Sequence, residues 1–205
     1  MIAFTRHSGI AVGLDLANVD TDQIIPVRFL TRSREEGFAD ALFHNLRRDG
    51  KVTGPRVIEW PLYQGATILV TGRNFGCGSS REQAVWALLD FGFRCVIAPS
   101  FGDLFYNNAC TNGLLPVRLD EPLVAEILRD FHDRPRGEIS VDLAGETVLD
   151  TSGRGLRFDI DPFWKNALLQ GMTDLQITQR HSDEIARFER MHKERMCWMF
   201  GEECR

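Results

Sequence analysis

The chain has 205 residues, of which 43% are hydrophobic and 26% are charged, a balance typical of a globular protein with a sizeable core. Its formal net charge is −5 and no lysine- or arginine-rich stripe stands out, which argues against a nucleic-acid or membrane-surface partner. No apolar run approaches the roughly 18 residues of a membrane span, and the first residues lack a signal-peptide core, so we expect a cytoplasmic protein.

The first part of the chain predicts a strand, a polar turn and a charged loop. Residues 10–14 are apolar and predict the strand, and the turn that follows contains Asp20 and Asp22. We expect these two carboxylates to bond the backbone amides of the turn rather than a metal. Residues 27–37 are charged and lack periodicity, which predicts a mobile surface loop, and residues 38–46 predict a short amphipathic helix.

The most informative segment is residues 72–83, which read Gly-Arg-Asn-Phe-Gly-Cys-Gly-Ser-Ser-Arg-Glu-Gln. A β-branched apolar run precedes it and apolar residues at helical spacing follow it, so the sequence predicts a strand, a glycine turn and a helix. Gly72, Gly76 and Gly78 allow positive φ angles and the close approach of a ligand. The helix N-terminus offers unpaired N–H groups to an anion.

Ser79 has a structural interpretation as well as a functional one. Residues 79–82 spell a capping box, in which Ser79 caps the helix and Glu82 reaches back to it. Capping does not account for three glycines, a second serine and Arg81 together. A Walker loop requires Gly-Lys before Ser or Thr, and a dinucleotide fingerprint requires a glycine where Arg81 stands, so neither nucleotide loop fits.

The rest of the chain predicts a β-α-β unit followed by short strands and C-terminal helices. Gly92 is placed to end the first helix, and the apolar stripe of the last helix indicates packing rather than a cofactor site. The fold class is therefore α/β, with a parallel core, an added β layer and C-terminal helices. The predicted strands are 94–98, 114–117, 139–143, 147–149 and 156–160, and the predicted helices are 101–107, 123–128, 162–170 and 181–200.

The five cysteines are scattered and contain no Cys-x-x-Cys pair, which predicts free thiols in a reducing compartment. They offer no set able to hold an iron–sulfur cluster, and the histidines have no paired spacing, so no metal site is expected in this chain. Cys77 lies in the glycine loop, but no local signature pairs it with a histidine as a nucleophile.

The segment Gly-Arg-Asn-Phe-Gly-Cys-Gly-Ser-Ser-Arg-Glu resembles the active-site loop of the swivelling domain in the aconitase superfamily. Further collinear matches resemble the small subunits of 3-isopropylmalate dehydratase, also called isopropylmalate isomerase. They are Asn-Val-Asp-Thr-Asp-Gln-Ile-Ile-Pro at 18–26 and the segments 90–94, 96–101, 113–117 and 158–161. The resemblance implies one swivelling β/β/α three-layer domain over residues 1–205, with a C-terminal helical extension from about residue 162.

The resemblance also implies an activity and a set of catalytic residues. The family interconverts 2-isopropylmalate and 3-isopropylmalate by dehydration and rehydration in leucine biosynthesis. Ser79 would be the base, as an alkoxide stabilised by amides around Gly78, and Arg81 with Ser80 would hold a carboxylate of the dicarboxylate substrate. This chain would bind no cofactor, because the [4Fe-4S] cluster is expected on a large partner subunit.

Residues 27–37 correspond to the family's substrate-recognition loop, in which Leu30 would face the alkyl group and Arg32 a carboxylate. The chain departs from the family pattern here, because Glu35 replaces a second arginine and Arg34 stands one place earlier. Arg32 and Arg34 therefore also fit simple solvated charges.

A second departure is Gln83, which stands where the family usually has histidine. Three alternatives stay open: a related hydro-lyase acting on another alkylmalate or maleate, a non-catalytic anion-binding module, and a scaffold subunit.

Overall fold

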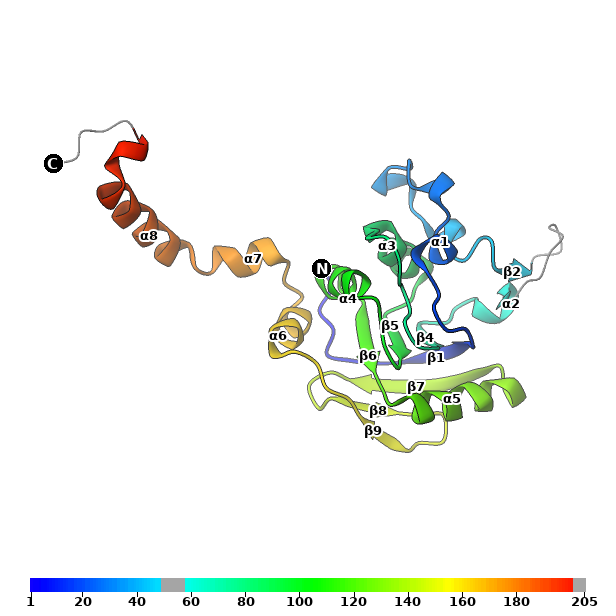
Figure 1. Cartoon of the computed structure of the whole chain (residues 1–205). Helices are drawn as coiled ribbons and strands as arrows, with labels where there is room; N and C mark the ends of the chain where they lie inside the picture. Colours follow the sequence, from blue (N-terminus) through cyan, green and yellow to red (C-terminus); the bar gives the residue numbers. More distant parts are fainter. Residues whose placement is uncertain (49–57, 201–205) are drawn as a thin grey trace. The chain divides into compact units, whose positions relative to one another are not determined.

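The computed structural model describes residues 1–48 and 58–200. The chain divides into two compact units, Met1–Gly171 and Met172–Arg205. The first unit is built on one mixed seven-stranded sheet in the order β6-β5-β4-β1-β7-β8-β9 (Figure 1). Its strands are β1 (Arg6–Leu14), β4 (Ile68–Thr71), β5 (Cys95–Ala98), β6 (Leu115–Arg118), β7 (Arg136–Asp142), β8 (Thr147–Leu149) and β9 (Gly155–Arg157), and a separate parallel pair joins β2 (Arg47–Arg48) to β3 (Ile58–Glu59).

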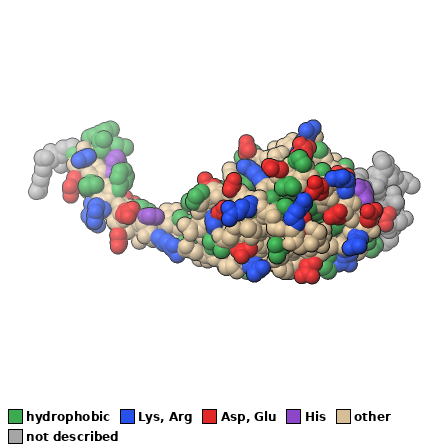
Figure 2. Space-filling model, turned by 90° about the horizontal axis from the view of Figure 1, so that it is seen from below, with side chains coloured by type: hydrophobic (Ala, Val, Ile, Leu, Met, Phe, Trp, Pro, Cys, Tyr) green, Lys and Arg blue, Asp and Glu red, His purple; other side chains and the backbone are tan. Residues whose placement is uncertain are grey.

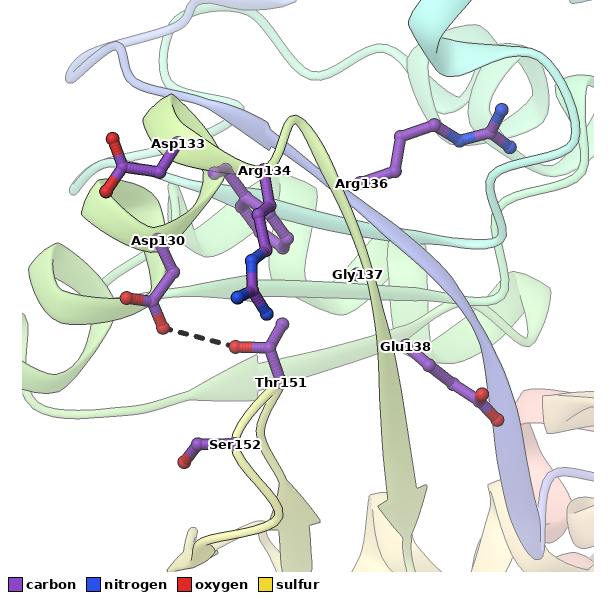
Figure 3. Close-up of a pocket in the computed structure, with 9 residues that line it drawn as sticks. Asp130, Asp133, Arg134, Arg136, Gly137, Glu138, Thr151 and Ser152 are labelled. Atoms are coloured by element: carbon purple, nitrogen blue, oxygen red, sulfur yellow. Dashed lines mark hydrogen bonds between the residues drawn. The ribbon is translucent and has the colours of Figure 1, made fainter.

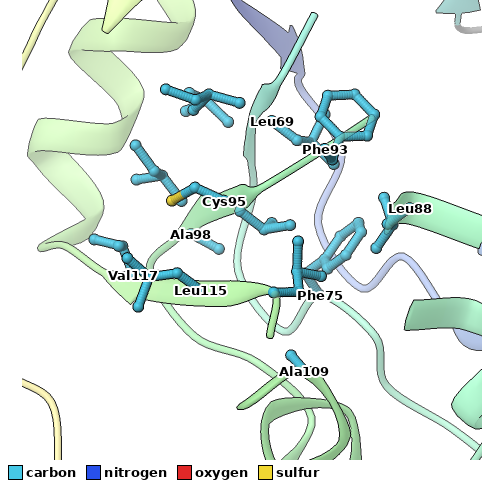
Figure 4. Packing of buried hydrophobic residues seen from close by; sticks show 14 of the residues in the cluster. Leu69, Phe75, Leu88, Phe93, Cys95, Ala98, Ala109, Leu115 and Val117 are labelled. Atoms are coloured by element: carbon cyan, nitrogen blue, oxygen red, sulfur yellow. The ribbon is translucent and has the colours of Figure 1, made fainter. Parts of the chain in front are cut away.

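The parallel half of the sheet contains the predicted β-α-β repeat. Strands β1, β4, β5 and β6 are parallel, and α3 (Glu82–Phe91) and α4 (Asp103–Asn112) form the crossovers between the last three. Every residue of β4 and β5 is buried, because α3 and α4 cover one face of the sheet and α5 (Glu121–Asp133) covers the other. Figure 4 shows side chains from these strands and helices meeting in one hydrophobic core.

The antiparallel strands extend the same sheet and form the added β layer. Strand β7 pairs with β1 from Arg6↔Asp142 to Val12↔Arg136, and β8 and β9 follow as hairpins. β1 thus joins the two halves, and it begins earlier than the predicted residues 10–14. Its first half is polar and largely exposed, so hydrophobic patterning could not reveal it.

Hydrogen bonds hold the turn after β8 around one buried carboxylate. Asp150 is 6% exposed and accepts bonds from the backbone N–H and hydroxyl of Ser152 and from the backbone N–H and Nε of Arg154. Burial alone raises the pKa of Asp150, but the hydrogen bonds from Ser152 and Arg154 outweigh it and hold the pKa below its usual value.

Several predicted helices differ in extent. Residues 38–46 contain only the 3₁₀ turn η3 (Ala39–Ala41), because Phe38, Leu42 and Phe43 are all fully buried and tertiary packing overrides an amphipathic helix. The helix predicted at 101–107 runs to Asn112, where Gly113 caps it in the left-handed conformation. α6 (Pro162–Gln170) has the predicted bounds, and the remaining short elements of this unit are α1 (Thr21–Ile24), η1 (Val27–Phe29), η2 (Arg34–Glu36) and α2 (Trp60–Tyr63).

α6 belongs to the first unit, because Leu168 is fully buried in the core and its carbonyl accepts a 2.9 Å bond from the Phe4 N–H. The second unit contains α7 (Asp174–Gln179), α8 (Ser182–Arg195) and η4 (Cys197–Phe200). The apolar stripe predicted to pack lies largely exposed on α8, with Phe188 61% exposed.

Among the described residues, no helix is long and apolar enough to cross a membrane. Figure 2 shows one face of the molecule, on which acidic and basic side chains are interspersed. Cys77, Cys95 and Cys110 are free thiols as predicted, whereas Cys197 forms a disulfide and the prediction is wrong there.

Candidate active site

The glycine loop lies where the carboxyl ends of β1, β4 and β5 meet at one edge of the sheet. On one side, the Phe75 N–H donates to the Ser100 carbonyl at 3.1 Å. On the other side, the Gly76 N–H donates to the Val19 carbonyl at 2.7 Å, and the Thr21 N–H donates to the Cys77 carbonyl at 3.0 Å. The loops after three parallel strands therefore hold the segment from both sides, in the usual position of an α/β ligand site.

Two of the three predicted glycines have the expected conformation. Gly76 has a φ of +73° and Gly78 a φ of +91°, in the region that favours glycine. The prediction of positive φ is wrong for Gly72, which is absent from the positive-φ residues. Gly72 is required instead by the close approach of another strand end, because a Cβ there would lie 2.5 Å from the Leu16 carbonyl oxygen.

The structure contradicts the capping interpretation of Ser79. Helix α3 begins at Glu82 rather than at Ser80, and its N-cap is Arg81, whose side chain makes no capping bond. Arg81 is extended, with φ −138° and ψ 106°, so Ser79 stands two residues before the N-cap. The Ser79 side chain is exposed, and its hydroxyl bonds to no residue that the structure describes.

The backbone around Ser79 contains N–H groups without an acceptor. None of the N–H groups of residues 79–83 donates to another described residue, so they remain available at the N-terminus of a ten-residue helix. The Asn108 side chain on α4 lies 3.4 Å from the Ser80 hydroxyl, and Asn112 donates to Glu82 at 2.9 Å. α4 thus braces the start of α3 through two asparagine side chains.

Arg81 is oriented by a carboxylate of the preceding turn. Its two terminal nitrogens bond the two oxygens of Asp22 at 2.5 and 3.0 Å, and the Arg81 side chain is only 13% exposed. The expectation that Asp22 caps its own turn is therefore wrong, whereas Asp20 does cap α1, accepting from the Gln23 N–H at 2.7 Å. The pairing uses the two terminal nitrogens, and the Nε–H has no acceptor among the described residues.

The predicted recognition loop is anchored by ion pairs. Arg32 makes a bidentate pair with Asp40 at 2.6 and 3.0 Å, and Arg34 makes one with Asp90 at 2.6 and 2.7 Å. These two arginines are therefore not isolated solvated charges. Arg28 instead bonds an amide and has no carboxylate partner among residues 1–48 and 58–200.

The structure brings together only part of the predicted site. Ser79, Ser80, Arg81 and Gly78 lie in one loop before α3, whereas the recognition loop is tied to Asp90 near the other end of the same helix. From Glu82, at the start of α3, to Asp90 the helix rises by about 12 Å over eight residues. Leu30 packs against the hydrophobic core and is partly buried.

Sequence reasoning missed four residues that support the loop, namely Thr21, Asp22, Asn108 and Asn112. Thr21 and Asp22 lie in the Asn-Val-Asp-Thr-Asp segment. Because this segment matches the family so specifically, it could have pointed to both residues.

A hollow of about 540 Å³ lies elsewhere, at the end of α5 and the start of β7 (Figure 3). Acidic and basic side chains line it, and Thr151 donates to Asp130 at 3.2 Å. It includes none of the predicted site residues, whereas the glycine loop lies where the carboxyl ends of three parallel strands meet, so the glycine loop remains the better candidate.

Comparison with known proteins identifies the family. The aconitase C-terminal domain family matches residues 1–122. The 3-isopropylmalate dehydratase small subunit of Paramagnetospirillum magneticum is 44% identical over 201 residues, covering 97% of this chain and 100% of that protein. That of Brevibacillus brevis is 44% identical over 191 residues, covering 92% and 98%. A crystal structure of 3-isopropylmalate dehydratase from Methanocaldococcus jannaschii has a TM-score of 0.66 at 25% identity, covering 89% of this chain and 98% of that one. The chain therefore belongs to the family of 3-isopropylmalate dehydratase small subunits and carries an aconitase C-terminal domain.

Proposed function

We propose that this chain is the small subunit of a 3-isopropylmalate dehydratase and interconverts 2-isopropylmalate and 3-isopropylmalate together with a large subunit. The observation that carries the proposal is the placement of Ser79. Its hydroxyl is exposed and does not cap α3, and five N–H groups without a described acceptor and an oriented arginine lie in the same loop and the first turn of α3.

The reaction removes water and returns it with the opposite regiochemistry, which requires a base for a carbon-bound proton. Ser79 is the base in this proposal, as an alkoxide stabilised by the free N–H groups and the positive end of α3. Arg81 holds a substrate carboxylate through charge-assisted hydrogen bonds, assisted by the Ser80 hydroxyl and the Gly78 backbone. Leu30 and Arg32 then contact the alkyl group and the second carboxylate.

The hydroxide leaves from an unactivated carbon, for which a [4Fe-4S] cluster supplies a Lewis acid in the family. The described residues do not fit such a cluster, because no three His, Cys, Asp or Glu side chains among them are grouped to hold a metal. Burial raises the pKa of the Cys110 thiol to about 12 and also raises that of Cys95, which keeps both thiols protonated. The proposal therefore assigns the cluster to the large subunit. It also includes a cytoplasmic location for the complex.

Gln83 and Glu35 stand where the family usually has other residues. These two departures concern the identity of the substrate's alkyl group. A related hydro-lyase acting on another 2-alkylmalate is the second candidate. Turnover of several 2-alkylmalates by the reconstituted complex separates the two, because the proposed enzyme turns over 2-isopropylmalate fastest.

The test is dehydratase activity of the purified chain with and without its large subunit. We expect the chain alone to be inactive, and Ser79→Ala to lower turnover of the complex by at least ~10²-fold, the low end for a positioned acid–base group. Ser8→Ala, which alters an exposed serine on β1, is the control and leaves turnover unchanged. Activity of the small chain alone, or a loss of only a few fold in Ser79→Ala, contradicts the proposal.

A further inference from the structure

Thr21 is a buried polar residue that touches the glycine loop directly. Thr21 is the first residue of α1 and is only 2% exposed. The Thr21 hydroxyl donates to the Ser79 carbonyl at 3.0 Å, and its N–H donates to the Cys77 carbonyl at 3.0 Å. One residue from a distant turn therefore bonds two carbonyls on either side of Gly78.

The Ser79 carbonyl is the group that a capping box at residues 79–82 requires. If Ser79 were the N-cap of α3, its carbonyl would accept the first helical bond from the Gln83 N–H, and its hydroxyl would accept from the Glu82 N–H. In the structure, neither N–H donates to a described residue, and the carbonyl accepts from Thr21 instead. The hydroxyl of Thr21 thus takes the place of the helical donor.

The orientation of the next peptide follows from the same bond. In a trans peptide the carbonyl and the following N–H point in opposite directions, and the described chain contains no cis bond. Because the Ser79 carbonyl points toward the buried Thr21, the Ser80 N–H points away from it. Ser79 and Ser80 are both exposed, so this direction is toward the open side of the loop.

We propose that Thr21 is a positioning residue, which holds residues 79–81 out of α3 so that the Ser79 hydroxyl faces substrate instead of capping the helix. The local sequence favours a capping box, and the Thr21 hydroxyl opposes it from another part of the fold. The catalytic consequence rests on the proposed role of Ser79 as base, whereas the structural consequence does not.

The test removes the hydroxyl with Thr21→Val and keeps it with Thr21→Ser. In Thr21→Val, α3 extends toward Ser79, so we expect amide hydrogen exchange at Glu82 and Gln83 to slow at least tenfold in NMR of the small chain. In the reconstituted complex we expect kcat to fall at least tenfold with a smaller change in KM. Because Thr21→Ser keeps the hydroxyl, we expect it to behave like the wild type in both measurements.

The matched control is Thr71→Val, because Thr71 is also fully buried and its hydroxyl donates to a backbone carbonyl, that of Leu16. It loses an equivalent bond without releasing Ser79, so exchange at Glu82 and Gln83 and kcat stay as in the wild type. Unchanged exchange at Glu82 and Gln83, or unchanged kcat, in Thr21→Val overturns the inference. Full activity of Ser79→Ala overturns the proposed function instead, and leaves the exchange measurement to decide the structural role of Thr21.

Discussion

Replacing Gly76 by alanine should destabilise the protein through two separable effects. The φ of +73° costs a residue with a Cβ roughly 1–2 kcal/mol. The added Cβ would also lie 2.6 Å from Cβ and Cδ2 of Phe105. Phe105 is 2% exposed and is packed edge-on against Phe75 and stacked on Phe101, so it has no room to retreat. Overpacking of this kind costs about 1–3 kcal/mol.

The sum is about 2–5 kcal/mol, which at roughly 2–4 °C per kcal/mol lowers Tm by about 4–20 °C for a chain of this size. Gly78→Ala is the matched control, because its φ of +91° carries the same backbone cost while its nearest contacts, on Asp20 and Thr21, lie at 3.7 Å. We expect it to lower Tm by about 2–8 °C. Differential scanning calorimetry of both variants is the assay. A Gly76→Ala protein that melts no lower than Gly78→Ala refutes the steric reasoning.

Arg32→Ala should raise KM of the complex roughly 10- to 150-fold, the equivalent of about 1.5–3 kcal/mol for a charged hydrogen bond, with Asp40→Ala as the control that keeps the cation. An unchanged KM would transfer the carboxylate contact to Arg28. A third prediction concerns pH. The native pKa of Asp150 lies below that of the unfolded chain, so its stabilisation is present above the unfolded pKa of about 3.9 and is lost as the pH falls through the native pKa. Urea unfolding should therefore show a gap in unfolding free energy between the wild type and Asp150→Asn that shrinks below about pH 4. A gap of constant size down to about pH 2 would rule this account out.

The parallel core and the glycine turn between a strand and a helix can be read from the amino-acid sequence alone. The apolar runs of β4, β5 and β6 alternate with stretches of helical periodicity. Such runs must be buried in the folded protein, so they predict the central strands of the sheet. Gly92 ends α3 as the sequence predicts, because glycine tolerates the positive φ that this helix C-terminus adopts. The glycine loop and its serines were visible for the same local reason.

The way in which that loop is held depends on contacts that form only in the folded protein. Residues 79–82 carry a capping box that the fold leaves unmade, because the Ser79 carbonyl bonds Thr21, which is 58 residues away in sequence. Asp20 and Asp22 look alike in the sequence, yet one caps α1 and the other orients Arg81, since only the fold places an arginine beside Asp22. Local patterns describe bonds within a few residues, and the bonds that set these roles join parts of the chain that meet only when the sheet is complete.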